Sequence, residues 1–241
     1  MRNVLISGAS RGVGLGIARK LSGSGYRVIA LARKPSDALT AAIAEAPADS
    51  LHFKAFDLSK IDDIPEMVRA LKAQFGPLYG LVNNAALGTE GLLSNMHNSQ
   101  IEDLVRVNTI SPIVLSKYAV RGMMTAGEGR IVNISSIIGS TGYSGLSVYG
   151  ATKAAMIGFT KSLAREVGRL GVTVNAVAPG FMDTELTKSM DEAQRGQIAR
   201  RSALQRLVEV EDVAEAVAFL MGPAARNITG TVMTVDAGNT A

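Results

Sequence analysis

The residues best suited to acid–base chemistry are a tyrosine and a lysine four positions apart, in Tyr149-Gly150-Ala151-Thr152-Lys153. This segment opens a predicted helix, and positions i and i+4 share one helical face, so the ammonium lies one turn from the phenol. A free tyrosine titrates near 10, and lowering its pKa by about 3 units takes roughly 4 kcal/mol of preferential phenolate stabilisation. A close ammonium is one source of that stabilisation. Alone, the pair also fits a purely structural role, because tyrosine and lysine often meet at this spacing by chance.

A second candidate site is the glycine turn Gly8-Ala9-Ser10-Arg11-Gly12-Val13-Gly14, which follows an apolar strand and precedes a helical pattern. Glycines there allow a tight turn, close approach of the backbone to a pyrophosphate, and helix N–H groups that face the anion. A Walker P-loop is excluded, because no Lys-Ser or Lys-Thr follows the glycines. A flexible surface turn is the alternative, but the strand before and the helix after favour dinucleotide binding.

The end of the second predicted strand indicates which dinucleotide is bound. NAD-binding units usually place Asp or Glu about 20 residues after the glycine turn, against the ribose 2′-hydroxyl. This chain has no acidic residue between Arg27 and Lys34 and offers Arg33 and Lys34 instead, with Arg11 inside the turn. Cations there would pair with a 2′-phosphate. The pattern favours NADP(H) over NAD(H), the alternative being two solvated surface cations.

The elements that must position these residues alternate along the chain, as in parallel sheets with helical crossovers. Strands are predicted near 3–8, 27–32, 51–56, 79–83, 130–135, 172–178 and 231–235. Helices are predicted near 12–22, 37–46, 60–75, 99–124, 148–169 and 210–221. Ligands bind at the carboxyl ends of such strands, so the insertion at about 181–208 is predicted to be a lid over the site.

Composition excludes several classes of protein. The 241 residues contain no Cys and two His, which argues against thiolate chemistry, disulfides and metal sites. A net charge of +4 comes from scattered basic residues, without the basic stripe and interleaved aromatics of a nucleic-acid binder. The chain has neither a signal-peptide pattern nor an uncharged apolar run of about 18 residues, so we expect a cytoplasmic protein without membrane contact.

Over essentially its whole length the chain resembles the short-chain dehydrogenase/reductase family. The matching stretches are Gly8-x3-Gly12-x-Gly14, Asp57-Leu58, Asn83-Asn84-Ala85, Asn108, Ser135-Ser136, Tyr149-x3-Lys153, Pro179-Gly180 and Val235-Asp236-Ala237-Gly238. Within the family the segments 161–167 and 175–181 are most similar to 3-oxoacyl-[acyl-carrier-protein] reductases. The resemblance implies one Rossmann-type α/β domain over 1–241. Its doubly wound seven-stranded parallel sheet would have the order 3-2-1-4-5-6-7 with helices on both faces.

The resemblance also implies catalytic roles. Tyr149 would protonate a carbonyl oxygen, and Ser136 would hydrogen-bond the same oxygen. Lys153 would hold the nicotinamide ribose and lower the tyrosine pKa. Asn108 would kink its helix and hold a water that relays protons to Lys153. Together the four would form one electrostatic unit aimed at the developing oxyanion.

For the cofactor, the resemblance places Asp57 and Asn83 beside the adenine and Thr184 against the carboxamide, while Ser7 and Asp236 are interpreted as structural. The full set of expected NADP(H)-binding residues is Gly8, Ser10, Arg11, Gly12, Val13, Gly14, Arg33, Lys34, Asp57, Leu58, Asn83, Ala85, Tyr149, Lys153, Pro179, Gly180 and Thr184.

Some positions depart from the family pattern. Ala86 replaces the usual glycine after Asn-Asn-Ala, and the loop that follows it differs from that of housekeeping fatty-acid reductases. The segment 125–129, which contains Glu128 and no basic residue, stands where carrier-protein reductases tend to present basic residues to an acidic partner. The cations that remain for such a partner are Arg121, Arg130, Arg165 and Arg169.

The leading hypothesis is an NADPH-dependent reductase of a 3-oxoacyl thioester or a similar apolar ketone, with acyl carrier protein as a partner. The alternatives are an enzyme of a free small alcohol or ketone (sugar, polyol or secondary metabolite) and a non-catalytic nucleotide-binding regulator. A serine hydrolase is excluded, because the chain lacks a Gly-x-Ser-x-Gly elbow. As the family is commonly tetrameric, we expect a homotetramer that uses the apolar helices 99–124 and 148–169 and the last strand.

Overall fold

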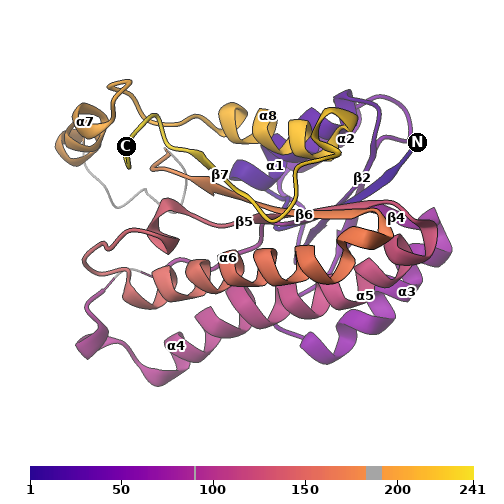
Figure 1. The fold of residues 1–241 in the computed structure, drawn as a ribbon, viewed down its shortest axis with the longest axis horizontal. Helices are drawn as coiled ribbons and strands as arrows, with labels where there is room; N and C mark the ends of the chain where they lie inside the picture. Colours follow the sequence, from indigo (N-terminus) through magenta and orange to yellow (C-terminus); the bar gives the residue numbers. More distant parts are fainter. Residues whose placement is uncertain (90, 183–191) are drawn as a thin grey trace.

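Strands and helices alternate along the chain and fold into three layers, a sheet between two sets of helices (Figure 1). The computed structural model describes residues 1–89, 91–182 and 192–241. Its seven strands form one sheet in the predicted order, β3-β2-β1-β4-β5-β6-β7, and every pairing is parallel. The strands are β1 (Asn3–Ser7), β2 (Arg27–Ala32), β3 (Leu51–Ala55), β4 (Leu78–Asn83), β5 (Gly129–Ile134), β6 (Val172–Pro179) and β7 (Val232–Val235).

Helices α1, α2 and α8 cover one face of the sheet, and α3, α4, α5 and α6 cover the other (Figure 1). No helix in the described ranges is long and apolar enough to cross a membrane. The α-helices are α1 (Gly12–Gly23), α2 (Asp37–Glu45), α3 (Ile64–Phe75), α4 (Asn98–Val105), α5 (Ser111–Ala126), α6 (Ser147–Val167), α7 (Glu192–Arg201) and α8 (Val210–Met221).

The two helical layers create two apolar cores, because successive strand residues point to opposite faces of a sheet. Val4 and Ile6 of β1 belong to the core under α1 and α8. Leu5, between them, belongs to the core under α3, α5 and α6. All five residues of β1 are buried, as predicted for a strand covered on both faces.

The helix predicted over 99–124 is in fact interrupted. Between α4 and α5 lies a π-helical turn, η3 (Arg106–Ile110). Pro112 stands at the start of α5 and has no N–H, so it cannot donate the α-helical bond to the carbonyl of Asn108 four residues earlier. A π turn accommodates such a break without ending the helical path.

Candidate active site

The catalytic candidates meet where β5 ends and α6 begins. Ser136 follows the carboxyl end of β5, and Tyr149 lies in the first turn of α6. The Ser136 side chain lies close enough to the Tyr149 hydroxyl to lower its pKa by hydrogen bonding. One turn further along α6, the Lys153 ammonium donates to the carbonyl of Ile134 at 2.8 Å. The structure thus brings two hydroxyl groups and a cation together at the sheet edge where parallel α/β proteins bind ligands.

Lys153 is buried, with 4% of its surface exposed. Burial disfavours the charged form and lowers the pKa of Lys153 to about 8. The Lys153 nitrogen lies 5.6 Å from the centre of the Tyr149 ring. The ammonium is therefore held near the phenol and remains mostly protonated at pH 7.

The pKa of Tyr149 is raised in the protein alone, whereas the family resemblance implies that Lys153 lowers it. Burial raises the pKa of Tyr149 above its ordinary value, and the hydrogen bond with Ser136 offsets this only in part. The physical reason is that Tyr149 is itself buried, while the Lys153 ammonium donates to the Ile134 carbonyl. In the protein alone, Tyr149 is thus a protonated phenol at neutral pH, which is the form an acid requires.

Asn108, predicted to kink its helix, lies in the π turn and is 2% exposed. Its side-chain oxygen accepts from the Leu87 N–H at 2.8 Å. Its side-chain nitrogen donates to the Leu87 carbonyl at 2.9 Å and to the Thr152 hydroxyl at 3.2 Å. The amide thus joins the loop after β4 to α6, and its role in holding a relay water stays a prediction.

The glycine turn connects β1 to α1 as predicted. The turn is tied to β2, because the Gly8 N–H donates to the carbonyl of Leu31 at 2.8 Å. At Gly14 a Cβ atom would lie 2.3 Å from the Gly8 carbonyl oxygen, so only glycine allows this close approach of helix and turn. At Gly12, with φ 53°, a Cβ would meet nothing within 4 Å. No side chain caps the first turn of α1 at its N-cap residue Arg11.

This geometry fits a dinucleotide. Uncapped N–H groups at a helix N-terminus, next to an open glycine backbone, favour a pyrophosphate. Val13 and Ser10 flank the same opening and are partly buried. Ser36, the N-cap of α2, donates to the Ser10 carbonyl and holds this side of the turn in place.

The predicted 2′-phosphate cations, Arg33 and Lys34, follow β2 and are exposed. Asp57 follows β3 and accepts from the Ser59 N–H at 3.0 Å. That hydrogen bond, with a smaller contribution from the charge of Arg33, lowers the pKa of Asp57. Asp57 is therefore an anion at neutral pH whose field reaches Arg33, consistent with the two residues bordering one end of the site.

The side chain of Asn83 lies in the core, and the contact of this residue with the adenine stays a prediction. It is 5% exposed, and its nitrogen donates to Ser116 at 2.9 Å and to Asn133 at 2.8 Å. Since side chains alternate along a strand, the next residue, Asn84, points to the glycine turn instead. Its nitrogen donates to the carbonyls of Ser7 at 3.0 Å and Gly8 at 3.1 Å.

Asn84 is a further residue of the site. It belongs to the motif Asn83-Asn84-Ala85, but the sequence analysis predicted no role for it. The signal available was its position directly after a strand neighbouring β1. The adjacent Ala85 backs the turn, since a Cβ at Gly8 would lie 2.7 Å from the Ala85 Cα. Ser7 is structural as interpreted, because its hydroxyl accepts from the N–H groups of Asn84 and Ala85, each at 3.0 Å. Leu58 contributes its carbonyl to the Ser111 hydroxyl at 2.6 Å.

The opposite side of the site is formed by the end of β6. Pro179 ends that strand, and the Gly180 N–H donates to the Val235 carbonyl at 2.8 Å. A Cβ at Gly180 would lie 2.8 Å from the Asp236 Cα, so the two segments pack backbone to backbone. Asp236 is structural, as interpreted, because its carboxylate accepts from the N–H groups of Gly238 and Thr240, each at 2.9 Å.

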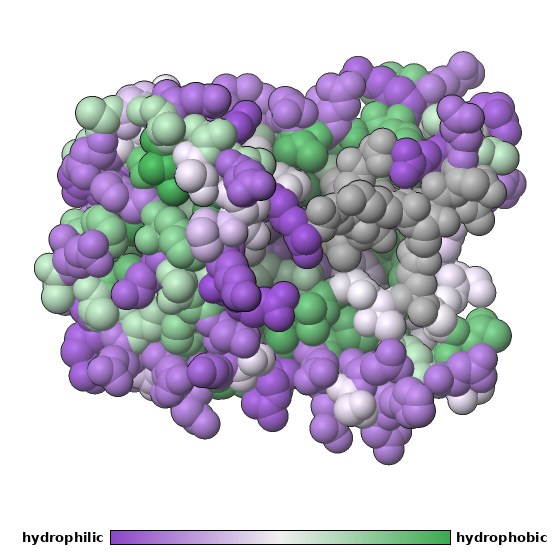
Figure 2. Space-filling model, turned by 180° about the vertical axis from the view of Figure 1, so that it is seen from behind, coloured by the Kyte–Doolittle hydropathy of each residue, from purple (hydrophilic) through white to green (hydrophobic). Residues whose placement is uncertain are grey.

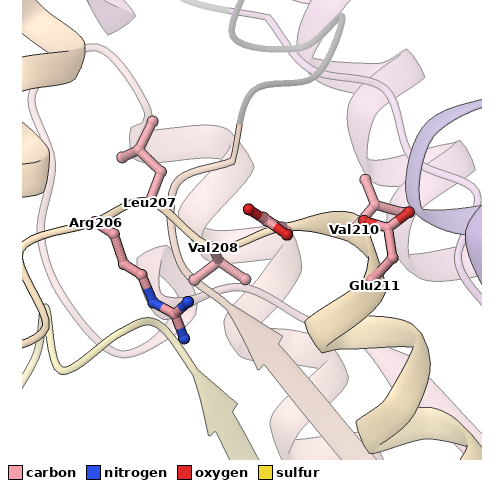
Figure 3. A pocket seen from close by; sticks show the side chains of 6 residues that line it. Arg206, Leu207, Val208, Val210 and Glu211 are labelled. Carbon is pink, nitrogen blue, oxygen red and sulfur yellow. The ribbon is translucent and has the colours of Figure 1, made fainter.

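The predicted lid falls partly outside the described residues, and Thr184 lies outside them. The described parts of the lid include a parallel bridge between Met182 and Val208 and the helix α7, which lies beside the C-terminus (Figure 1). Figure 3 shows a hollow at the far end of this segment, with Arg206 and Glu211 at opposite ends of it. None of Ser136, Tyr149 and Lys153 lines that hollow.

Comparison with known proteins agrees with this geometry. The family profile described as "Enoyl-(Acyl carrier protein) reductase" matches residues 8–240. The chain is 40% identical over 234 residues to "3-oxoacyl-[acyl-carrier-protein] reductase FabG" of Vibrio cholerae, covering 97% of this chain and 95% of that protein. The protein of the same description from Escherichia coli is 39% identical over 237 residues, with the same coverage.

A solved crystal structure of a single-substitution variant of "Actinorhodin Polyketide Ketoreductase with NADPH" superposes with a TM-score of 0.91 at 32% identity. The superposition covers 99% of this chain and 97% of the ketoreductase chain. The chain belongs to the short-chain dehydrogenase/reductase family. It is an oxidoreductase of that family, whose members use a nicotinamide dinucleotide.

Proposed function

We propose that the protein reduces a ketone to an alcohol with NADPH, and that Tyr149 delivers the proton. The observation that carries this proposal is the proximity of the pair Ser136 and Tyr149 to the buried Lys153, whose nitrogen lies 5.6 Å from the centre of the Tyr149 ring. A substrate carbonyl oxygen placed against the pair accepts from both hydroxyl groups, and Tyr149 transfers its proton as negative charge develops. The ammonium of Lys153 stabilises the phenolate that is left.

Bound at the site, NADPH supplies the hydride. Its pyrophosphate would face Gly12 and the uncapped N-terminus of α1, and Lys153 would hold the nicotinamide ribose. Arg33 and Arg11 would grip the 2′-phosphate. Support for NADPH over NADH comes from the exposed Arg33 and Lys34 after β2 and from the absence of an acidic residue between Arg27 and Lys34.

For the substrate we propose a 3-oxoacyl thioester. The support is the full-length similarity to relatives described as 3-oxoacyl-[acyl-carrier-protein] reductases. Under this proposal an acyl carrier protein is the partner that delivers the thioester.

A free small-molecule ketone is a second candidate, favoured by where the remaining cations lie. Arg165 is in the last turn of α6, about 24 Å along the axis from Tyr149 at 1.5 Å per residue. Arg130 is at the opposite end of β5 from Ser136, about 20 Å away at 3.3 Å per residue, with its guanidinium over the Tyr79 ring. Within one chain these cations are remote from the catalytic pair, so they do not flank the entrance to it.

An NADPH-oxidation screen over carrier-borne and free 3-oxoacyl thioesters, keto esters, quinones and sugars tests the proposal. We expect the 3-oxoacyl thioesters to have the highest kcat/KM. A carrier-borne substrate that reacts faster than its free thioester, with an advantage that declines as salt screens charge, supports delivery by the carrier. A higher kcat/KM on a free ketone would favour the second candidate, and no turnover of any carbonyl would overturn the proposal.

A further inference from the structure

Thr152 lies between the two residues of the tyrosine–lysine pair and is 2% exposed. Its hydroxyl donates to the Tyr149 carbonyl at 2.7 Å. The same hydroxyl accepts from the side-chain nitrogen of Asn108 at 3.2 Å. A hydroxyl group can do both, because it provides a donor and an acceptor on one atom.

Asn108 carries the connection further, to the loop that follows β4. One of its two side-chain N–H groups bonds Thr152, and the other bonds the Leu87 carbonyl at 2.9 Å. The Leu87 N–H donates back to Asn108 at 2.8 Å. The same loop is held a second time, since the Gly91 N–H donates to the Gly145 carbonyl just before α6 at 3.0 Å.

A bond from a helical threonine to the carbonyl three or four residues earlier is common and needs no functional explanation. The bond from Asn108 is different, because it joins the helix turn of Tyr149 to another element. Losing the hydroxyl would leave a buried amide N–H of Asn108 without its acceptor, which favours a change in how that side chain is placed.

We propose that Thr152 is a positioning residue, which fixes the first turn of α6, and with it Tyr149, relative to Asn108 and the loop at Leu87. The inference rests on the proposed function, because the proton that Tyr149 delivers needs a fixed direction toward the substrate carbonyl. Thr152 does not touch the reacting atoms. It acts through the Tyr149 carbonyl and the Asn108 amide.

The chain contains a matched control two turns along the same helix. Thr160 is fully buried, donates to the Met156 carbonyl at 2.7 Å and accepts from the Asn133 side chain at 2.8 Å. It thus has the same bonding pattern as Thr152 without a link to Asn108 or the loop. Thr160→Val reports the structural cost of removing such a hydroxyl, and Thr152→Val adds any positioning effect.

We expect Thr152→Val to lower kcat for ketone reduction by about tenfold or more, the scale of a small misplacement of reacting groups. The NADPH dissociation constant should stay within about twofold, Thr152→Ser should recover most of kcat, and Thr160→Val should keep it. Equal kcat in Thr152→Val and wild type, an equal loss in Thr160→Val, or no rescue by serine would overturn the proposal. Thr152→Ala serves the same comparison if the valine variant does not fold.

Hydrogen exchange tests the coupling without any substrate. In Thr152→Val the Leu87 amide should exchange faster, because its acceptor on Asn108 is less well held, whereas Thr160→Val should leave it unchanged. Unchanged exchange at Leu87 in Thr152→Val would overturn the coupling. If no carbonyl substrate is ever turned over, the proposed function fails on that result, while this exchange experiment still decides the role of Thr152.

Discussion

Burial acts in opposite directions on the two titratable residues of the site. It raises the pKa of Tyr149 and lowers the pKa of Lys153, because in both cases it disfavours the charged form. At neutral pH the phenol therefore keeps its proton, and the ammonium keeps most of its charge. This combination suits reduction, in which the tyrosine gives up a proton and a neighbouring cation stabilises the anion left behind.

Removing the phenol oxygen tests the assignment of the acid. Tyr149→Phe keeps the ring but removes the proton donor, so reductase activity should fall by at least about 10²-fold, the usual contribution of a positioned acid. NADPH binding, measured by fluorescence titration, should remain nearly intact. A phenylalanine variant that still turns over at the wild-type rate would refute the role of Tyr149.

The pH dependence of reduction should reflect Lys153 before Tyr149. Lys153 loses its proton as the pH rises through about 8, whereas Tyr149, whose pKa is raised, is still protonated there. The kcat/KM for the ketone, which reports groups of the free enzyme, should therefore decline above a pH of about 8. A profile that stays flat to about pH 10, the ordinary range of tyrosine, would show that the ammonium is not required.

Arg33 is the residue on which the coenzyme prediction depends. Arg33→Asp replaces attraction to a 2′-phosphate by repulsion and should weaken NADPH binding by about 2–5 kcal/mol. NADH lacks that phosphate, so its binding should change far less. Isothermal titration with both coenzymes measures the difference, and a wild type that already prefers NADH would contradict the prediction at its basis.

The tyrosine–lysine spacing alone did not identify the catalytic candidates. The order of the whole set of motifs did so, because it resembles one family, and the roles of these residues stay predictions. The placement of other site residues was harder to predict from the sequence, as the pair Asn83 and Asn84 shows. Both are polar and follow one strand, and only the direction of alternation decides that Asn83 enters the core while Asn84 meets the glycine turn. The sequence pattern does not set that direction when both residues are the same amino acid.

At the scale of elements, the alternation of strands and helices was predictable from the sequence pattern, but the break in the long helix was expected only from the family resemblance, as a kink at Asn108. Hydrophobic periodicity runs on through 99–124, so it predicts one helix. Pro112 was the available signal, since a proline inside a helical pattern removes the bond to the residue four positions earlier. That residue is Asn108, so the break falls at the catalytic candidate itself.

The glycine turn provides a prediction at this scale. A methyl at Gly14 would lie 2.3 Å from the Gly8 oxygen and 2.5 Å from the Asn84 nitrogen, so turn and helix must separate. Gly14→Ala should lower the free energy of unfolding by about 1–3 kcal/mol, as overpacking does. Thermal unfolding and NADPH titration measure the two effects, and the NADPH dissociation constant should rise by about tenfold or more.

Gly23→Ala is the matched control, at the last residue of the same helix. Its Cβ would meet nothing within 4 Å, and alanine favours a helix over glycine. The control should keep NADPH binding and be at least as stable as the wild type. An equal loss of NADPH affinity in both variants would show that the close approach at Gly14 is not what shapes the binding turn.

At the scale of the whole molecule, the alternation of strands and helices predicted the layers of a parallel sheet, and the family resemblance predicted the strand order, which the structure confirms. The surface was less predictable. Four arginines were candidates for a carrier-protein site from the sequence, namely Arg121, Arg130, Arg165 and Arg169. Only the folded chain shows that Arg130 stacks on Tyr79 at the end of the sheet opposite Ser136.

Figure 2 shows hydrophilic side chains along the outline of one face of the molecule, with apolar patches between them. Among the exposed apolar side chains, Val105, Ile110 and Met124 belong to the continuous path of α4, η3 and α5, with 38%, 41% and 38% of their surfaces exposed. This path is part of the region in which we expect subunit contacts, together with α6 and β7. Covering it in an oligomer would remove apolar area from water, which favours association.

We therefore predict a homotetramer of about 100 kDa by light scattering, four times the 25.2 kDa chain. In an interface with two-fold symmetry a substitution is present on both subunits, so Ile110→Glu buries two carboxylates and should shift the mass toward dimer or monomer. Phe219→Glu is the control, since Phe219 is equally exposed at 41% but belongs to α8 on the other face of the sheet. Its mass should match the wild type. A wild-type mass near that of one chain would contradict the prediction, and an unchanged mass in Ile110→Glu would place the interface elsewhere.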